Sequence, residues 1–272
     1  MLPAVAASSG QDMDDIRIER RGPVQWITID REERRNAIND NVLSGIERGI
    51  REAMAAVPEV RAIVLTGAGN RAFCAGADLK RTGDDRPFQI AHLDPATRIG
   101  DLFRLVERCT LPIVARINGH AMAGGMGLAA MCDLAVAADH ARFGLPEARI
   151  GVWPMMIMTY LTRVIPRRKL LELMMTGEPI GAQEALEIGF VNHVVPAAEL
   201  DAKTGWLLER ILKSSPTAIR RGKHVWHAMQ DMSLHQAITL AESNAGLMGT
   251  SEDAREGIAA FNEKRPPNWP GR

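Results

Sequence analysis

Two short loops rich in glycine and alanine are the segments of this 272-residue sequence with the clearest capacity for chemistry. They span residues 74–78 (CAGAD) and 121–125 (AMAGG), and each follows a predicted strand. Small side chains let the backbone approach a ligand closely, so two such loops can offer two convergent N–H donors to one oxygen atom. The same composition suits tight turns with close helix packing, and composition and spacing alone leave that alternative open.

Other catalytic patterns are absent or lack the context that they require. Residues 67–72 (GAGNRA) fit the loose G-x-G-x-x-A dinucleotide fingerprint, which should open a helix. Residues 73–78 follow it and are typical of a loop, so we predict no nucleotide site there. The sequence contains no G-x-S-x-G, P-loop or H-E-x-x-H pattern, which weighs against hydrolase, NTPase and zinc-protease functions.

The elements that must position the two loops alternate between strands and helices. Residues 16–19 and 24–29 alternate in polarity around Gly22 and Pro23, which predicts a hairpin, and residues 40–54 have apolar side chains at helical spacing. Further strands are predicted at 62–65, 113–117 and 134–137, with helical segments at 102–106 and 124–131. Such alternation indicates parallel strands joined by helical crossovers.

Helical patterns dominate the sequence after Phe143. They are found at 157–164, 167–176, 182–188, 198–213, 216–229, 233–247 and 252–262. We therefore predict an α/β protein in three parts, namely an untethered leader at 1–15, a core at 16–197 and a helical region at 198–272.

Composition excludes several classes of partner. Lys and Arg number 33 and Asp and Glu number 33, so the chain lacks the basic excess of a nucleic-acid or anionic-membrane binder. No apolar run reaches the roughly 18 residues of a membrane span. The leader has no basic residue before Arg17, unlike a signal or transit peptide, and the three cysteines form no C-x-x-C pair. We expect a cytoplasmic protein with reduced thiols, no membrane contact and no metal site.

Six segments in register resemble the enoyl-CoA hydratase/isomerase, or crotonase, superfamily, and the resemblance runs from about residue 16 to the C-terminus. They are NAIN at 36–39, AFCAGADLK at 72–80, INGHAMAGG at 117–125, MCD at 131–133, FGLPE at 143–147 and FNEKRP at 261–266. The resemblance implies a spiral core of ββα repeats followed by a C-terminal helical region that mediates trimerisation. It also implies an acyl-CoA substrate, no separate cofactor because coenzyme A is part of that substrate, and a homotrimer or a hexamer built as a dimer of trimers.

The resemblance also assigns the site residues. In this family two backbone N–H groups polarise the thioester carbonyl, and the matching positions are Ala77 and Gly124. The positions that match the family's CoA contacts are Arg35, Ala37, Ala75, Asp78, Leu79 and Lys80, with Phe261 and Lys264 reaching the adenine bound to a neighbouring subunit. Arg34 and Arg81 are further candidates for the phosphates, against the alternative that each is an ordinary solvated side chain.

One departure from the family pattern bears on the reaction. Hydratases of the family use two glutamates; Glu147 matches the second, whereas the first falls on Gly127. A lone carboxylate can take a proton from one carbon and return it to another, but water addition usually needs a second group to orient the water. We therefore predict double-bond isomerisation, and we expect a Gly127→Glu substitution to raise hydration.

Two alternatives stay open at this point. The first is an enoyl-CoA hydratase in which backbone groups hold the water in place of the missing glutamate. The second is a non-catalytic acyl-CoA-binding or assembly protein, because one fold can host many roles.

Overall fold

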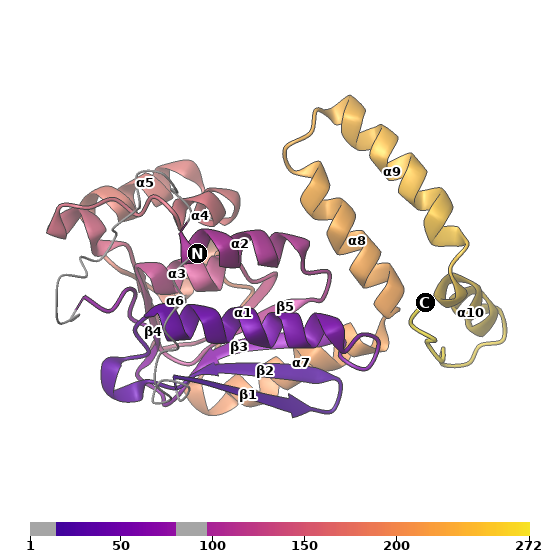
Figure 1. The fold of residues 1–272 in the computed structure, drawn as a ribbon, viewed down its shortest axis with the longest axis horizontal. Coiled ribbons are helices and arrows are strands. Elements are labelled where there is room, and N and C mark those ends of the chain that lie inside the picture. The colour runs from indigo at the N-terminus through magenta and orange to yellow at the C-terminus, as the bar shows by residue number, and fades with distance from the viewer. Residues whose placement is uncertain (1–14, 80–96) are drawn as a thin grey trace, which may run out of the picture.

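The computed structural model describes residues 15–79 and 97–272. Within these ranges six strands form the larger sheet, in the order β1-β2-β3-β5-β7-β10 (Figure 1). Their bounds are β1 Ile16–Arg21, β2 Val24–Ile29, β3 Ala62–Gly67, β5 Ile113–Ile117, β7 Leu134–Ala138 and β10 His193–Val195. The first two strands form the predicted hairpin, which pairs Arg21 with Val24 across its turn. The remaining neighbours are parallel, as the alternation of strands and helices predicts.

A smaller sheet has the order β4-β6-β8-β9 in the described part of the chain. Its strands are β4 Ala72–Cys74, β6 His120–Met122, β8 Arg142–Gly144 and β9 Ile180–Gly181. The first three are parallel to one another, and β9 closes the sheet antiparallel to β8. Three consecutive turns of the chain therefore have the same form: β3–β4–α2, β5–β6–α3 and β7–β8–η2. The predicted α/β class and its spiral of ββα repeats are confirmed.

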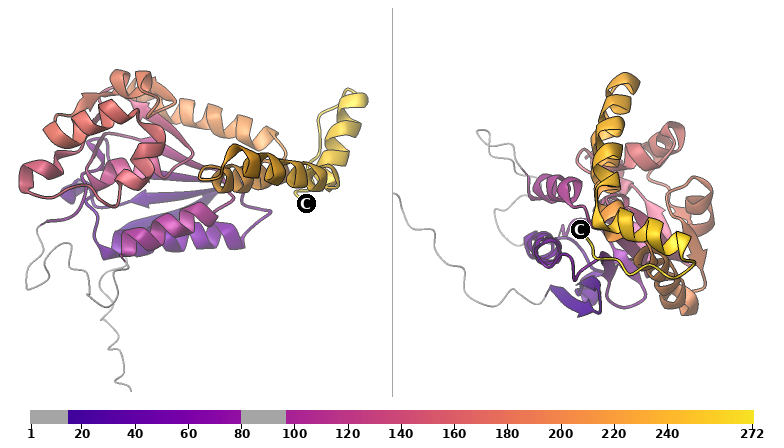
Figure 2. Two further views of the ribbon diagram at one scale, coloured as in Figure 1. Left: turned by 90° about the horizontal axis from the view of Figure 1, so that it is seen from above. Right: turned by 90° about the vertical axis from the view of Figure 1, so that its right-hand side faces the viewer.

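Helices cover both faces of the larger sheet (Figure 2). On one face lie α1 (Asp40–Ala55) and α2 (Arg98–Arg108), and on the other lies α7 (Leu200–Lys213). The strand β3 is buried on both faces: Ile63 packs in the core that includes α1, whereas Val64 packs in the core that includes Leu208 of α7. This explains why β3 reads as a continuous apolar run rather than an alternating one.

Capping fixes where these helices begin. The side chain of Asn39 accepts a hydrogen bond from Val42 N at 2.8 Å and starts α1, and Thr97 accepts one from Gly100 N at 3.2 Å and starts α2. An N-cap of this kind is typically worth about 1 kcal/mol. The remaining helices are η1 Glu32–Arg34, α3 Gly124–Ala130, η2 Pro146–Ile150, α4 Met158–Val164, α5 Arg167–Thr176, α6 Ala182–Glu187 and η3 Ala197–Glu199.

The C-terminal helices α8 (Pro216–Met229), α9 (Leu234–Gly249) and α10 (Glu252–Asn262) extend away from the sheets (Figures 1 and 2). A polar contact attaches α8 to the core: Lys223 Nζ donates to Asp133 Oδ2 at 2.6 Å and to the Leu111 carbonyl at 2.7 Å. Among the residues that the structure describes, no helix is long and apolar enough to span a membrane.

The sequence interpretation missed the strands of the smaller sheet. Residues 73–78 were expected to be a loop, but β4 includes residues 72–74, and β6 begins before the predicted loop at 121–125. Strands also continue after Phe143, in β8, β9 and β10. Strands of only two or three residues have no measurable period, and only their pairing with distant strands defines them. Cys74 of β4 is fully buried, and burial raises the pKa of its thiol to about 12.

Candidate active site

The candidate catalytic residues follow the carboxyl ends of three neighbouring parallel strands. The strand β4 ends at Cys74 and leads to Ala77, β6 ends at Met122 and leads to Gly124, and β8 ends at Gly144 and leads to Glu147. Because the carboxyl ends of parallel strands meet at one edge of a sheet, the topology gathers these segments, as Met122 pairing with Gly144 illustrates. Sequence segments some 70 residues apart thus converge at one end of the molecule.

The backbone N–H of Ala77 is turned toward this site. Ile38 forms an isolated parallel bridge with Ala77, in which Ile38 N donates to Gly76 O and Asp78 N donates to Ile38 O, each at 2.8 Å. In such a bridge the flanking residues make the hydrogen bonds, so the N–H of Ala77 itself points away from Ile38. Ala77 is exposed. This amide is therefore held in place by its neighbours, and it belongs to an exposed residue.

The second amide, that of Gly124, is set by an unusual backbone conformation at Ala123. Ala123 has φ 50° and ψ −123°, although it is not glycine, and its N–H donates to Gly144 O at 2.8 Å. Strained conformations of this kind cluster at functional sites. Gly76, with φ +93°, must be glycine here, because a Cβ on it would lie 2.7 Å from the Ala123 Cβ and 3.3 Å from Gly124 N.

The two amides lie close together. A Cβ placed on Gly124 would be 3.8 Å from Ala77 N and 2.9 Å from Ile38 Cδ1. In the described ranges neither N–H donates to a backbone carbonyl outside its own element, and Gly124 opens α3, where the first N–H groups have no partner within the helix. Two preorganised donors of this kind can stabilise negative charge that develops on a carbonyl oxygen.

Two side chains to which the sequence interpretation assigned no role hold the Ala77 loop and the chain before it. The Arg31 guanidinium donates to Asp78 Oδ2 at 3.0 Å and to the Ala37 carbonyl at 2.6 Å. The buried Asn36 donates to the Ala68 and Ala72 carbonyls at 3.0 and 2.7 Å. Asn36 belongs to the NAIN segment at 36–39, but only these long-range contacts show what the side chains of Asn36 and Arg31 do.

Glu147 supplies the carboxylate of the site. It lies in η2 after Pro146, and its Oε2 atom is shielded from solvent without a hydrogen-bond partner among the described residues. Burial raises the pKa of this carboxyl above its ordinary value of 4.5, although a hydrogen bond from its own backbone N–H partly opposes that shift. A partly buried carboxylate with a raised pKa holds a proton more tightly than an ordinary glutamate and can both accept and return it.

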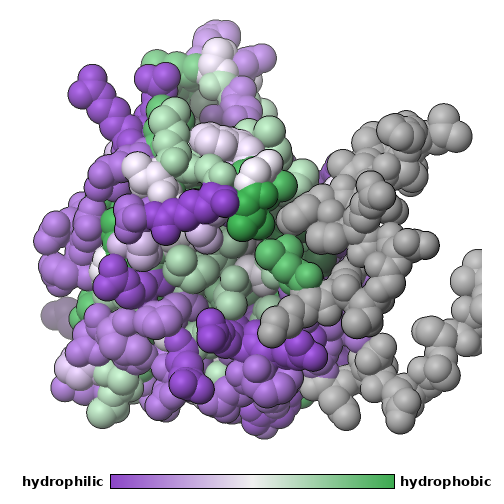
Figure 3. Space-filling model, turned by 90° about the vertical axis from the view of Figure 1, so that its left-hand side faces the viewer, coloured by the Kyte–Doolittle hydropathy of each residue, from purple (hydrophilic) through white to green (hydrophobic). Residues whose placement is uncertain are grey.

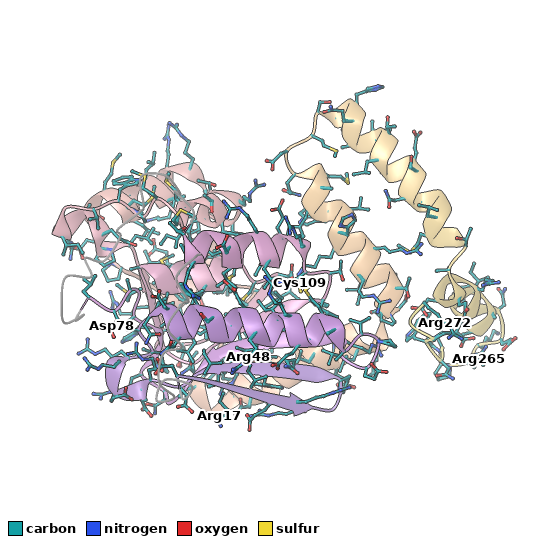
Figure 4. All side chains as sticks on the ribbon, viewed as in Figure 1. Arg17, Arg48, Asp78, Cys109, Arg265 and Arg272 are labelled. Carbon is teal, nitrogen blue, oxygen red and sulfur yellow. The ribbon has the colours of Figure 1, made fainter. Side chains whose placement is uncertain are left out.

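The predicted CoA-contact positions on the first loops lie together. Ala75 N donates to Arg35 O at 3.1 Å, and Arg31 links Ala37 to Asp78, so these predicted residues surround one pair of loops. Arg34 and Arg35 are exposed, and Leu79 is 51% exposed. Lys80 and Arg81 lie outside the described residues. The Asp78 carboxylate accepts a hydrogen bond from Arg31, and Asp78 lies at the left-hand end of the molecule in Figure 4.

The surface around this end is partly apolar. The exposed large apolar side chains that follow β4 and η2 are Leu79, Val152 and Met155. Figure 3 shows apolar surface on the same end, beside polar side chains. An apolar surface beside a polarising site suits an acyl chain. No group of three or more His, Cys, Asp or Glu side chains in 15–79 and 97–272 gathers as a metal site would require.

Phe261 and Lys264 lie at the opposite end of the molecule from the candidate site. They belong to α10 and the turn after it, near Arg265 at the right-hand side of Figure 4. Both are exposed, and the Phe261 side chain is 83% exposed. Within one chain they therefore cannot contact a ligand at Ala77, and their expected contact with a neighbouring subunit's adenine stays a prediction.

The position of the absent glutamate is filled by another side chain. A Cβ on Gly127 would lie 2.3 Å from Ile157 Cγ2 and 2.7 Å from Ile157 Cβ, far inside van der Waals contact. Ile157 is 6% exposed and lies directly before α4. The sequence shows the missing carboxylate at residue 127, but it does not show which residue takes its space.

Known proteins are similar to this chain in sequence and in fold. Residues 19–272 match the family model described as enoyl-CoA hydratase/isomerase. A carnitinyl-CoA dehydratase of Proteus mirabilis is 37% identical over 224 residues, which cover 79% of this chain and 83% of that protein. A short-chain-enoyl-CoA hydratase of Clostridium acetobutylicum is 32% identical over 261 residues, which cover 93% and 97%. The crystal structure of an enoyl-CoA hydratase from Bacillus anthracis has a TM-score of 0.88 at 32% identity and covers 95% of this chain and 100% of that one.

Proposed function

Because the chain belongs to the enoyl-CoA hydratase/isomerase family, we propose that this enzyme moves the double bond of an enoyl-CoA thioester. In the proposal Glu147 transfers the proton, and the amides of Ala77 and Gly124 hold the thioester oxygen. The observation that supports isomerisation most strongly is the pairing of one partly buried carboxylate, that of Glu147, with an apolar side chain at the position of the second.

The proposed reaction has two proton transfers. Glu147 removes a proton from C2 of a 3-enoyl-CoA, and the electron pair moves into the thioester, where the oxygen gains negative charge. The amides of Ala77 and Gly124 stabilise that charge, and one such donor is typically worth about 2.7 to 4 kcal/mol in the transition state. Glu147 then returns the proton to C4, and the double bond lies between C2 and C3. No water is consumed, and no separate cofactor takes part.

The cofactor portion of the substrate is proposed to lie along the Arg35 and Ala75 loops. Arg34 and Arg35 are exposed there and can pair with phosphates, which explains how a chain with no net charge binds a small polyanion. We also propose a homotrimer, or a hexamer formed from two trimers, assembled through the C-terminal helices. Large apolar side chains are exposed on these helices, and they are Trp226, Leu234, Ile238, Leu247, Ile258 and Phe261.

Hydration is the second candidate. The relatives named above are a dehydratase and hydratases, and a backbone-held water could replace the glutamate absent at residue 127. The two candidates differ in their products. Purified protein is incubated with 3-enoyl-CoA and, separately, with 2-enoyl-CoA, and the products are separated by chromatography. We expect 3-enoyl-CoA to yield 2-enoyl-CoA faster than 2-enoyl-CoA yields the 3-hydroxy product. The reverse order would favour hydration, and conversion of neither would favour a non-catalytic binding role.

The raised pKa of Glu147 predicts a pH dependence. Only the ionised carboxylate can remove the C2 proton, so activity falls as the pH drops through the pKa that Glu147 has in the folded protein. Because burial raises that pKa above 4.5, the loss begins at higher pH than for an ordinary glutamate. The measurement is kcat/KM for 3-enoyl-CoA against pH. An acidic limb at or below 4.5 would contradict the assignment of Glu147 as the base.

A further inference from the structure

The side chain of Ile157 occupies the space into which a residue at position 127 would project. Gly127 lies on α3 three residues after Gly124, so the two positions neighbour each other on the helix surface. The Gly127 Cβ position is 2.3 Å from Ile157 Cγ2 and 2.7 Å from Ile157 Cβ, but 3.6 Å from Ile157 Cα. The side chain of Ile157, and not its backbone, is therefore what closes this position.

The Ile157 side chain that blocks position 127 is held rigidly. Ile157 is 6% exposed, and its branched side chain belongs to the main hydrophobic core together with Met126 and Leu161, which are both fully buried. The backbone of Ile157 is fixed as well, because its carbonyl accepts hydrogen bonds from Leu161 N at 3.1 Å and Tyr160 N at 3.2 Å. A β-branched side chain in such a place has few alternative rotamers. It cannot swing aside to admit a carboxylate at residue 127.

We infer that Ile157 is a specificity-determining residue, which keeps a second acid and its water out of the site and so sets the ratio of hydration to double-bond migration. The inference rests on the proposed function, in which Glu147 works alone. It also alters the expectation from the sequence: Gly127→Glu by itself meets the Ile157 side chain. The carboxylate can enter only when Ile157 is also reduced to glycine, because the Ile157 Cα at 3.6 Å is at ordinary contact distance.

A double-mutant cycle tests the inference. Wild type, G127E, I157G and G127E/I157G are compared for hydration of 2-enoyl-CoA and for migration of the double bond in 3-enoyl-CoA. We expect G127E/I157G to raise the hydration-to-migration ratio by about tenfold or more over wild type, and each single variant to leave the ratio near the wild-type value. The matched control is G127E/I165G: Ile165 is a buried isoleucine at the other end of α4 and does not block residue 127, so this variant should not gain hydration.

A second measurement holds even if the glutamate variant does not fold. G127A adds only the Cβ that meets Ile157, so its Tm should lie below that of wild type. The Tm difference between G127A/I157G and I157G should be smaller than the difference between G127A and wild type. An unchanged Tm for G127A, or an equal hydration gain in G127E and G127E/I157G, would overturn the inference. If the wild-type enzyme does not catalyse double-bond migration, the proposed function is contradicted instead. The hydration gain of G127E/I157G over wild type then still tests the role of Ile157.

Discussion

Replacement of Glu147 by glutamine is expected to lower kcat for double-bond migration by about 10²- to 10⁴-fold, the usual contribution of a positioned acid–base group. Glutamine keeps the shape of the side chain but cannot take up a proton at neutral pH. Acyl-CoA binding should survive, because the amides of Ala77 and Gly124 and the Arg35 loop are unaffected. The measurements are steady-state kinetics with 3-enoyl-CoA and the affinity for a non-reacting acyl-CoA.

Stability separates a catalytic loss from a folding defect. The raised pKa of Glu147 means that the fold favours the protonated form, so stability falls as the pH rises from the ordinary glutamate pKa through the folded-state pKa and stays lower above it. E147Q should therefore have a Tm at neutral pH at least as high as that of wild type. The matched control is E187Q, at an exposed glutamate that ends α6, which should keep wild-type kcat. An E147Q enzyme with near wild-type kcat would remove Glu147 from the mechanism.

Replacement of Gly124 by alanine is expected to lower kcat by about 10²- to 10³-fold, because the new methyl group keeps the thioester oxygen away from the N–H that alanine retains, at the usual cost of one oxyanion donor. The new methyl group would lie 3.8 Å from Ala77 N and so would stand beside both donors. The fold should tolerate it, because Gly124 does not have a positive φ and the one close atom, Ile38 Cδ1 at 2.9 Å, ends a flexible side chain. KM should change far less than kcat, because the donors act most strongly on the charged oxygen of the transition state.

The control for this variant is G181A. Gly181 has φ −82° and no atom within 4 Å of its Cβ position, so alanine there should alter neither Tm nor kcat. A folded G124A enzyme whose kcat lies within about threefold of wild type would contradict the expectation that a side chain at residue 124 keeps the thioester oxygen from the two amides.

The sequence predicts those parts of the fold in which local pattern and packing agree. The strand β1 and the helix α1 show their period in the sequence because one face of each is buried. The smaller sheet is not predictable in this way. The strands β4, β6 and β8 have three residues each, and their pairing joins Ala72 to His120 and Met122 to Gly144 across long stretches of chain.

Some residues of the candidate site can likewise be found from the sequence, and others only from their contacts in the fold. The small residues around Ala77 and Gly124 are recognisable in the sequence because the backbone itself requires them, whereas Glu147 is identified by the family resemblance. Arg31 is not recognisable, since one arginine among several in the sequence becomes a positioning residue only through its contact with Asp78. Ile157 is likewise an ordinary apolar residue until the packing of α4 on α3 places it against Gly127.

Transfer of a label within the substrate tests the central claim most directly, namely that one carboxylate both removes and returns the proton. The wild-type enzyme is given 3-enoyl-CoA with deuterium at C2 in ordinary water, and the 2-enoyl-CoA formed during the first turnovers is analysed by mass spectrometry and NMR. We predict that part of the deuterium lost from C2 is found at C4, because the shielded Glu147 Oε2 returns it before complete exchange with solvent. Product whose new C4 hydrogen comes wholly from water, or no migration of the double bond, would contradict the account.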